Sequence, residues 1–283
     1  MTLVTTLHGR DGVVMFTDTQ ETVGGYAKKI VDKLTLWNVD GPFRFAIAAA
    51  TNDTTYLEML EREISRALFS VKSYALGEIE RSLVDALTGF YAKHIWPQPS
   101  KNHLIEFLIT LQPMPNGRPD VIHISGTAVS VPTISENHKS IGVGAYMADY
   151  LLPIFLGGGE DLAQLAMTAV YVGKEVHDNV DGVGPVDRII LLGNNGDYHE
   201  LYHDVIRELE ENLFPFRDVI QQAFRAASEV LDEGKGDLEH NYIGAELRDM
   251  REKNTELWNR MQQQIKAHAQ WREKFGNPKA GQQ

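Results

Sequence analysis

Residues 2–18 read TLVTTLHGRDGVVMFTD, and this stretch decides the fold. Apolar and β-branched residues lie on both sides of the turn sequence Gly9–Gly12, so the pattern predicts an antiparallel hairpin with strands over residues 2–8 and 12–18. If the turn is centred on Arg10, the pairing places Thr2 directly opposite Asp18. Residues paired across strands have Cβ atoms about 5 Å apart. The hairpin is therefore expected to bring its first hydroxyl close to its last carboxylate.

Strand and helix patterns follow the hairpin in alternating blocks. Further strands are predicted over residues 33–37, 43–50, 103–112, 120–129, 138–144 and 186–193. Helices are predicted over residues 51–71 and 77–95, and then consecutively over 145–156 and 160–178. Because the strands come in hairpins and the helices in pairs, the order predicts a layered α+β sandwich of antiparallel sheets.

The pattern changes to almost pure helix from about residue 204 onward, and the last residues are strongly polar. We therefore expect a main domain over residues 1–215 and a helical C-terminal extension over 216–283 with a frayed end. In the extension, apolar residues fall close to one helical stripe, which is typical of an assembly or docking helix or of a helix packed on its own domain. These residues are Leu247, Met250, Leu257, Met261 and Ile265.

Composition excludes several functional classes. The chain has 39 acidic and 27 basic side chains, a net charge of −12, which argues against binding nucleic acid or anionic membrane surfaces. It has no cysteine, which excludes disulfides, thiolate catalysis and cysteine-based zinc sites. No signal-peptide pattern and no stretch of 18 apolar residues is present, so the expected location is cytoplasmic. No cofactor and no metal is expected.

Three segments in a fixed order resemble the β-type subunits of the proteasome, which are N-terminal threonine hydrolases. They are DGVVMFTDTQETVGG (11–25), DKLTLW (32–37) and FAIAAATND (45–53). The resemblance covers roughly residues 2–200 and implies a four-layer αββα sandwich. HDNVDGVGPVDRIILL (177–192) resembles the family's segment that carries its second acid, and Gly-Pro-Val-Asp (184–187) within it is closer to the bacterial ancestral-β-subunit branch than to the typical archaeal or eukaryotic subunits.

The resemblance implies a catalytic set of Thr2 as nucleophile, Asp18, Lys33 and, as second acid, Asp178. It also implies that the backbone N–H of Ala49 serves as the oxyanion hole. Lys28-Lys29-Ile30 is a competing alignment for the catalytic lysine, but with it the next strand no longer aligns with the corresponding strand of the family. Thr5 and Thr6 are rivals for the nucleophile, although neither exposes an α-amine without a further cleavage.

The chemistry explains why these residue types are needed. A threonine hydroxyl is a weak nucleophile and requires a base. A free terminal amine has a pKa near 8 and is tied to the same residue, so Thr2 supplies both groups once Met1 is removed. A cation at Lys33, oriented by Asp18, favours the alkoxide as it develops. The implied reaction is acyl transfer through an acyl-enzyme intermediate.

The resemblance also implies what the site acts on and how the protein assembles. The substrate is a peptide or protein, bound by Thr22, Val31, Ile47 and Thr51, of which the last two match the family's first specificity pocket. Plain core packing is the alternative role for that pair. The family implies self-assembly into a ring or larger homo-oligomer. The sequence specifies neither the ring size nor an ATPase partner.

Two departures from the family's pattern suggest an alternative function. The family's supporting serines are replaced by Val143 and by Asp181 or Gly182. Their loss weakens the expected hydrogen bonds around the Thr2 amine. The chain could instead be a catalytically inactive, proteasome-like assembly subunit.

Two other motifs are expected to be decoys. HELYH at residues 199–203 matches the HExxH pattern of zinc metalloproteases, which needs both histidines on one helix face. Here the motif follows the turn sequence Asn194–Asp197, so we expect His199 on a strand. Gly157–Gly159 could form an anion nest but is expected to be a helix-to-helix connection.

Overall fold

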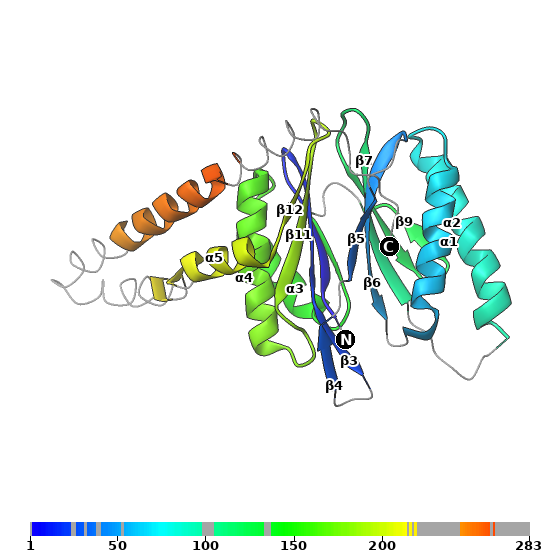
Figure 1. Ribbon diagram of the computed structural model, residues 1–283, viewed down its shortest axis with the longest axis horizontal. Coiled ribbons are helices and arrows are strands. Elements are labelled where there is room, and N and C mark those ends of the chain that lie inside the picture. Colours follow the sequence, from blue (N-terminus) through cyan, green and yellow to red (C-terminus); the bar gives the residue numbers. More distant parts are fainter. Residues whose placement is uncertain are drawn as a thin grey trace. The chain divides into compact units, whose positions relative to one another are not determined.

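The computed structural model describes most of the chain in two compact units, Met1–Ile206 and Arg207–Gln283. The boundary falls inside a helix, N-terminal to the predicted boundary after residue 215. The described residues are 2–23, 27–30, 33–37, 41–51, 54–97, 105–132, 137–213, 215–216, 218–219, 244–260 and 263. Each unit is considered separately below, and Figure 1 labels the elements of both.

The opening hairpin forms the centre of a five-stranded antiparallel sheet, here called sheet I. Its strand order is β10-β1-β2-β11-β12. The strands are β1 (Val4–His8), β2 (Gly12–Asp18), β10 (His138–Ile141), β11 (Val186–Gly193) and β12 (Tyr198–Leu201). β1 and β2 are buried along their whole length, because β10 and β11 flank them within the sheet while helices cover one face of it and a second sheet covers the other.

The predicted register of this hairpin was wrong by one residue. His8 pairs with Val13 and Val4 with Thr17, so four residues, Gly9–Gly12, form the turn. The N–H of Gly9 donates to the carbonyl of Gly12 and closes that turn. A turn centred on Arg10 requires an odd number of loop residues. The backbone of Asp18 consequently lies opposite Leu3, and its N–H donates to the Leu3 carbonyl over 3.1 Å.

Sheet II is a second five-stranded antiparallel sheet with the order β5-β6-β7-β8-β9. Its strands are β5 (Leu34–Trp37), β6 (Phe43–Thr51), β7 (Ile105–Pro113), β8 (Asp120–Ser125) and β9 (Ala128–Ser130). The segment predicted as one strand over residues 120–129 is divided by a tight turn at Gly126, whose φ is +60°.

A two-stranded hairpin extends from the end of sheet I at which β1 begins (Figure 1). It consists of β3 (Gln20–Val23) and β4 (Ala27–Ile30). Lys28 and Lys29 lie on β4, a strand that the sequence patterns did not predict. Each of the two strands has only four residues and lies between stronger strand patterns, so the sequence did not reveal the hairpin.

Two helical pairs cover the outer faces of the sheets and confirm the predicted αββα sandwich. A short 3₁₀ turn (Thr54–Tyr56) leads into α1 (Leu57–Ser70), which is followed by α2 (Leu76–Phe90) and a π-helical turn (Tyr91–Ile95). On sheet I, α3 (Ala145–Phe155) contacts β10 and β1, and α4 (Leu162–Asn179) contacts β2 and β11. Sheets I and II face each other where β1 and β10 pass over β6 and β7. Figure 1 shows the four layers.

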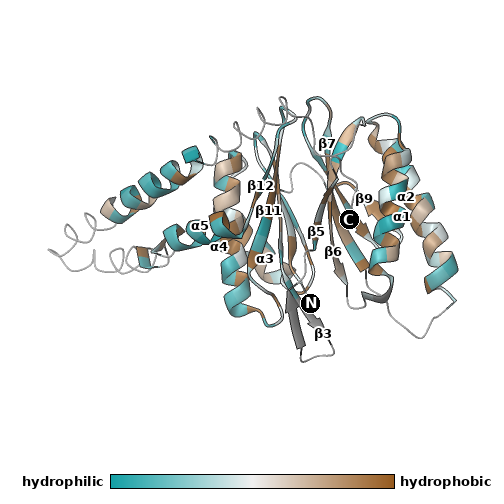
Figure 2. Ribbon diagram, in the orientation of Figure 1, coloured by the Kyte–Doolittle hydropathy of each residue, from teal (hydrophilic) through white to brown (hydrophobic). Residues whose placement is uncertain are grey.

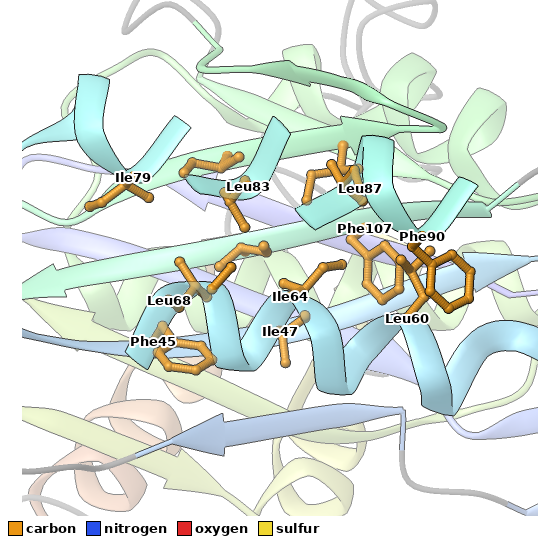
Figure 3. Close-up of a cluster of buried hydrophobic side chains, with 14 of the residues drawn as sticks. Phe45, Ile47, Leu60, Ile64, Leu68, Ile79, Leu83, Leu87, Phe90 and Phe107 are labelled. Atoms are coloured by element: carbon orange, nitrogen blue, oxygen red, sulfur yellow. The ribbon is translucent and has the colours of Figure 1, made fainter. Parts of the chain in front are cut away.

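The alternation of side chains along β6 divides the core into two clusters. Phe45 and Ile47 pack under α1 and α2 with Leu60, Ile64 and Leu68 (Figure 3). Ala46, Ala48 and Ala50 instead face sheet I and join Val4, Met15, Leu108 and Ile190 between the sheets. The helices carry both apolar and polar residues along their length (Figure 2), as expected for helices that bury one face.

The C-terminal unit is helical where it is described. It contains most of α5 (His203–Leu213) and a helix over residues 244–260. Met250 and Leu257 are buried whereas Leu247 is exposed, and Arg260 forms an ion pair with Glu208. Of the predicted stripe, Met261 and Ile265 lie outside the described residues. Among the described helices, none is long and apolar enough to cross a membrane.

Close packing of α4 on sheet I generates the first prediction. A Cβ added at Gly173 would lie 2.2 Å from Cγ2 of the buried, χ1-restricted Val186. We expect Gly173→Ala to lower the free energy of unfolding by about 1–3 kcal/mol, as overpacking does. A Cβ added at Gly89 on α2 would meet no atom within 4 Å. We therefore expect Gly89→Ala to raise the free energy of unfolding by up to about 1 kcal/mol. Urea unfolding of both variants measures the difference. Equal effects would contradict the packing argument.

Candidate active site

The carboxylate of Asp18, at the end of β2, organises the candidate site. Its side chain is fully buried. Its Oδ1 accepts the backbone N–H of Leu3 over 2.7 Å, and Oδ2 accepts those of Gln20 over 3.0 Å and Gly184 over 2.9 Å. The hydroxyl of Thr2 also donates to Oδ1. Asp18 therefore holds three separate chain segments as well as the predicted nucleophile.

Lys33 reaches this carboxylate from the other sheet. It directly precedes β5, and its Nζ lies 3.0 Å from both oxygens of Asp18. The same Nζ lies 2.7 Å from Oγ1 of Thr2 and also donates to the carbonyl of Gln20. The Lys33 side chain is 12% exposed, so its charge is largely shielded from water and compensated by Asp18. The structure thus brings together three of the four side chains predicted to be catalytic.

This arrangement suits a hydroxyl that becomes a nucleophile. The Thr2 hydroxyl accepts from the Lys33 ammonium and donates to Asp18. A cation fixed beside an oxygen stabilises negative charge that develops there, and does so more strongly in a site shielded from water. Because Asp18 already accepts three backbone N–H groups, the carboxylate cannot turn away without breaking them.

Two glycine loops, both with the sequence Gly-Val-Gly, position Thr2 and Asp18 through the main chain. In the first, Gly144 N–H donates to the Thr2 carbonyl over 3.2 Å. Gly142 has a φ of +91°, and a Cβ there would lie 2.3 Å from that carbonyl oxygen. In the second, Gly184 donates to Asp18, and an added Cβ would lie 2.5 Å from Cβ of Gln20.

These main-chain roles were not predicted from the sequence. The prediction considered only side-chain hydroxyls, which are absent at Val143 and at Asp181 or Gly182. The repeated Gly-Val-Gly at residues 142–144 and 182–184 was the available signal, because glycine permits a close approach of one backbone to another.

Asp178 does not join the site through any contact among the described residues. It lies near the end of α4 with its side chain 38% exposed, and both its oxygens accept from Lys174 over 3.0 Å. This spacing, four residues along a helix, is an ordinary surface ion pair. The carboxylate assigned as second acid is therefore engaged by its own helix.

The predicted substrate residues have diverse positions. Ile47 is 1% exposed and packs in the core under α1, which agrees with core packing, the alternative role given for it. Ala49 also packs toward that helix-facing cluster, and Thr51 ends β6 opposite Ile105. Thr22 lies on β3. Val31 lies outside the described residues.

The two decoy motifs have local structural explanations. His199 lies on β12, and His203 begins α5 with its Nδ1 2.6 Å from Asp187, so the HExxH residues do not share a helix face. Gly157–Gly159 connects α3 to α4. The N–H groups of Gly157 and Gly158 donate to the carboxylate of Glu160, which lowers the pKa of Glu160.

Comparison with solved structures shows what this architecture is similar to. A Gly-1 mutant of Anbu from Hyphomicrobium sp. strain MC1 has a TM-score of 0.66 at 16% identity, covering 80% of this chain and 97% of that one. Anbu (ancestral beta-subunit) from Yersinia bercovieri gives 0.64 at 12% identity, covering 77% and 95%. A helical assembly of the Anbu complex from Pseudomonas aeruginosa gives 0.60 at 12% identity, covering 76% and 95%.

No family model and no curated protein matches the sequence. At these identities the structural likeness establishes the fold. It confirms, at that level, the resemblance to proteasome β-type subunits of the bacterial ancestral branch.

The Asp18–Lys33 pair generates the second prediction. Asp18→Ala removes the carboxylate that compensates the Lys33 ammonium in a largely buried site, at a cost of about 3–5 kcal/mol in the free energy of unfolding. Asp18→Ala combined with Lys33→Met should lose distinctly less, because the uncompensated charge is gone. The stability that the double variant still loses measures the cost of leaving three backbone N–H groups without the Asp18 acceptor. Urea unfolding distinguishes the two variants, and an equal or larger loss in the double variant would disprove the charge argument.

Proposed function

We propose that this protein is an N-terminal-threonine peptidase or amidohydrolase of the proteasome-β type, acting through Thr2 after removal of Met1. The observation that carries the proposal is the position of Lys33, whose Nζ lies 2.7 Å from Oγ1 of Thr2 while both residues contact Asp18. The proteasome-β-like fold supports the same assignment.

In the proposed reaction, the free α-amine of Thr2 accepts the proton of its own hydroxyl. The oxygen attacks a peptide carbonyl while Lys33 stabilises the developing negative charge. The leaving amine takes the proton, and an acyl-enzyme ester remains on Oγ1. Water, activated by the same amine, then hydrolyses the ester and restores Thr2. The N–H of Ala49 is the proposed oxyanion donor. Asp178 is left out of the proposed set because Lys174 engages its carboxylate.

The proposal extends to substrate and assembly. The expected substrates are peptides or unfolded proteins, and the expected location is the cytoplasm. A structurally similar protein is described as a helical assembly of the Anbu complex. By analogy we propose that this chain also self-assembles into a larger homo-oligomer that restricts access to Thr2.

A second candidate function is a catalytically inactive assembly subunit of the same fold. One observation favours it: Thr2 is 4% exposed, and with Met1 attached its nitrogen is an amide that cannot act as a base. The two candidates differ in whether Met1 is removed and whether Thr2 then reacts.

Covalent labelling of Thr2 is the third prediction. We expect the purified protein to begin at Thr2 and to be acylated there by a β-lactone. Lys33→Ala should slow acylation by roughly 10²–10³-fold, because it removes the cation beside the oxygen. Lys33→Arg should not restore it, since a planar guanidinium does not replace a compact ammonium. Mass spectrometry of the N-terminal peptide measures both processing and labelling.

Two matched controls accompany this experiment. Lys29→Ala tests the competing alignment, and Asp178→Asn tests the family's second acid. Both should label at the rate of the wild type. A slow Lys29 variant would move the catalytic role to β4, and retention of Met1 in every preparation would favour the inactive subunit.

The fourth prediction concerns self-assembly. Because a threonine peptidase that restricts access to its site must enclose it, sedimentation should give a mass several times that of one chain. The Thr2→Ala variant should sediment identically, since assembly does not depend on the nucleophile. A monomer at micromolar concentration would contradict the proposal.

A further inference from the structure

Arg188 on β11 connects the two sheets close to the candidate site. Its Nη1 donates to the carbonyl of Leu34 over 2.6 Å, and its Nη2 lies 2.9 Å from Oε2 of Glu200 on β12. The hydroxyl of Tyr202 also donates to Glu200, over 2.9 Å. The side chains of Arg188 and Glu200 are 22% and 15% exposed. An arginine can satisfy two acceptors at once because its donors form a rigid planar fork.

Arg188 lies on the face of β11 that points toward sheet II, as Ile190 does in the same regular pairing with β2. β11 pairs regularly with β2 until Arg188 lies opposite Thr17, and the register then shifts so that Val186 lies opposite Asp18. In a regular strand, residues 186 and 188 would share a face. Here Val186 packs toward Gly173 of α4, whereas Arg188 reaches the opposite sheet. The bulge turns Val186, the residue opposite Asp18, toward α4, whereas Arg188 keeps the regular orientation toward sheet II.

The acceptor of this hydrogen bond is next to Lys33 in the chain. β5 is the edge strand of sheet II and pairs with β6 alone, beginning at the Leu34–Ala48 pair. Lys33 precedes that first pair, so sheet pairing restrains its backbone from one side. The Leu34 carbonyl is where a contact from sheet I can fix the base of the Lys33 side chain.

We propose that Arg188 is a positioning residue for Lys33. Its guanidinium holds the start of β5 against sheet I, Glu200 orients the guanidinium, and the Lys33 ammonium is thereby kept between Thr2 and Asp18. The kinetic consequence rests on the proposed function, whereas the positioning itself does not. Arg188 therefore acts on catalysis through Lys33.

The test compares Arg188→Met with a matched control, Arg44→Met. Arg44 on β6 is 6% exposed and also connects the sheets, donating to Gln112 over 2.6 Å and to the carbonyl of Gly196 over 3.0 Å. It lies at the opposite end of β6 from the alanines near Lys33. Each variant removes one arginine that connects the two sheets. Two readouts are used on folded protein: modification of Lys33 by an amine-directed acetylating reagent, and acylation of Thr2 by a β-lactone.

We expect Arg188→Met to raise Lys33 modification severalfold and to slow Thr2 acylation by roughly 10–100-fold, as small misplacements do. Arg188→Lys should behave similarly, because an ammonium cannot hold both acceptors in this geometry. Arg44→Met should leave both rates at the wild-type value. If Arg188→Met fails to fold, Glu200→Gln provides the same comparison in milder form.

The outcomes separate the two proposals. Unchanged Lys33 modification in the folded Arg188 variants, or an equal rise in Arg44→Met, would overturn the positioning role. If the wild type does not react with the lactone, the proposed peptidase function fails. Lys33 modification would still decide whether Arg188 positions that residue.

Discussion

The carboxylate of Asp18 is fully buried, so neighbouring donors and a cation must compensate its charge. It accepts main-chain N–H groups from the start of β1, the start of β3 and the loop before β11, and it forms an ion pair with Lys33 from sheet II. An isolated carboxylate in such a position would be strongly destabilising. The four segments are therefore held together by the same charge that orients Thr2. Stability and the geometry of the site depend on one group.

The surrounding backbone is shaped to let these contacts form. Gly142 and Gly184 allow two loops to approach Thr2 and Gln20 more closely than any residue with a Cβ could. On β11, Arg188 donates to β5, whereas the bulge before it turns Val186 toward α4. The site thus relies on main-chain groups and one arginine, and the chain lacks the supporting serines of the family's pattern, which Val143 and Asp181 or Gly182 replace.

The sequence predicted the central hairpin and the αββα order, because these follow from local patterning, and the resemblance to proteasome β-type subunits implied the association of Thr2, Asp18 and Lys33. Ile47 packs under α1, a contact between a strand and a helix that the local pattern does not specify. The pairing of Asp178 with Lys174, by contrast, is a local contact four residues apart on α4. The one-residue error in register arose because turn composition alone does not tell a three-residue loop from a four-residue one.

The sequence by itself determined the elements and the chemistry available: a hydroxyl at residue 2, an acid sixteen residues later, and a lysine before the next strand pair. Alternation and turn residues act over a few positions, so they can be read directly from the chain. Only the tertiary structure decided which face of β6 meets the helices and how closely Lys33 approaches Thr2 and Asp18. It also decided that Arg188 reaches β5. Those outcomes depend on how two separate sheets stack, and no short stretch of sequence encodes a contact between them.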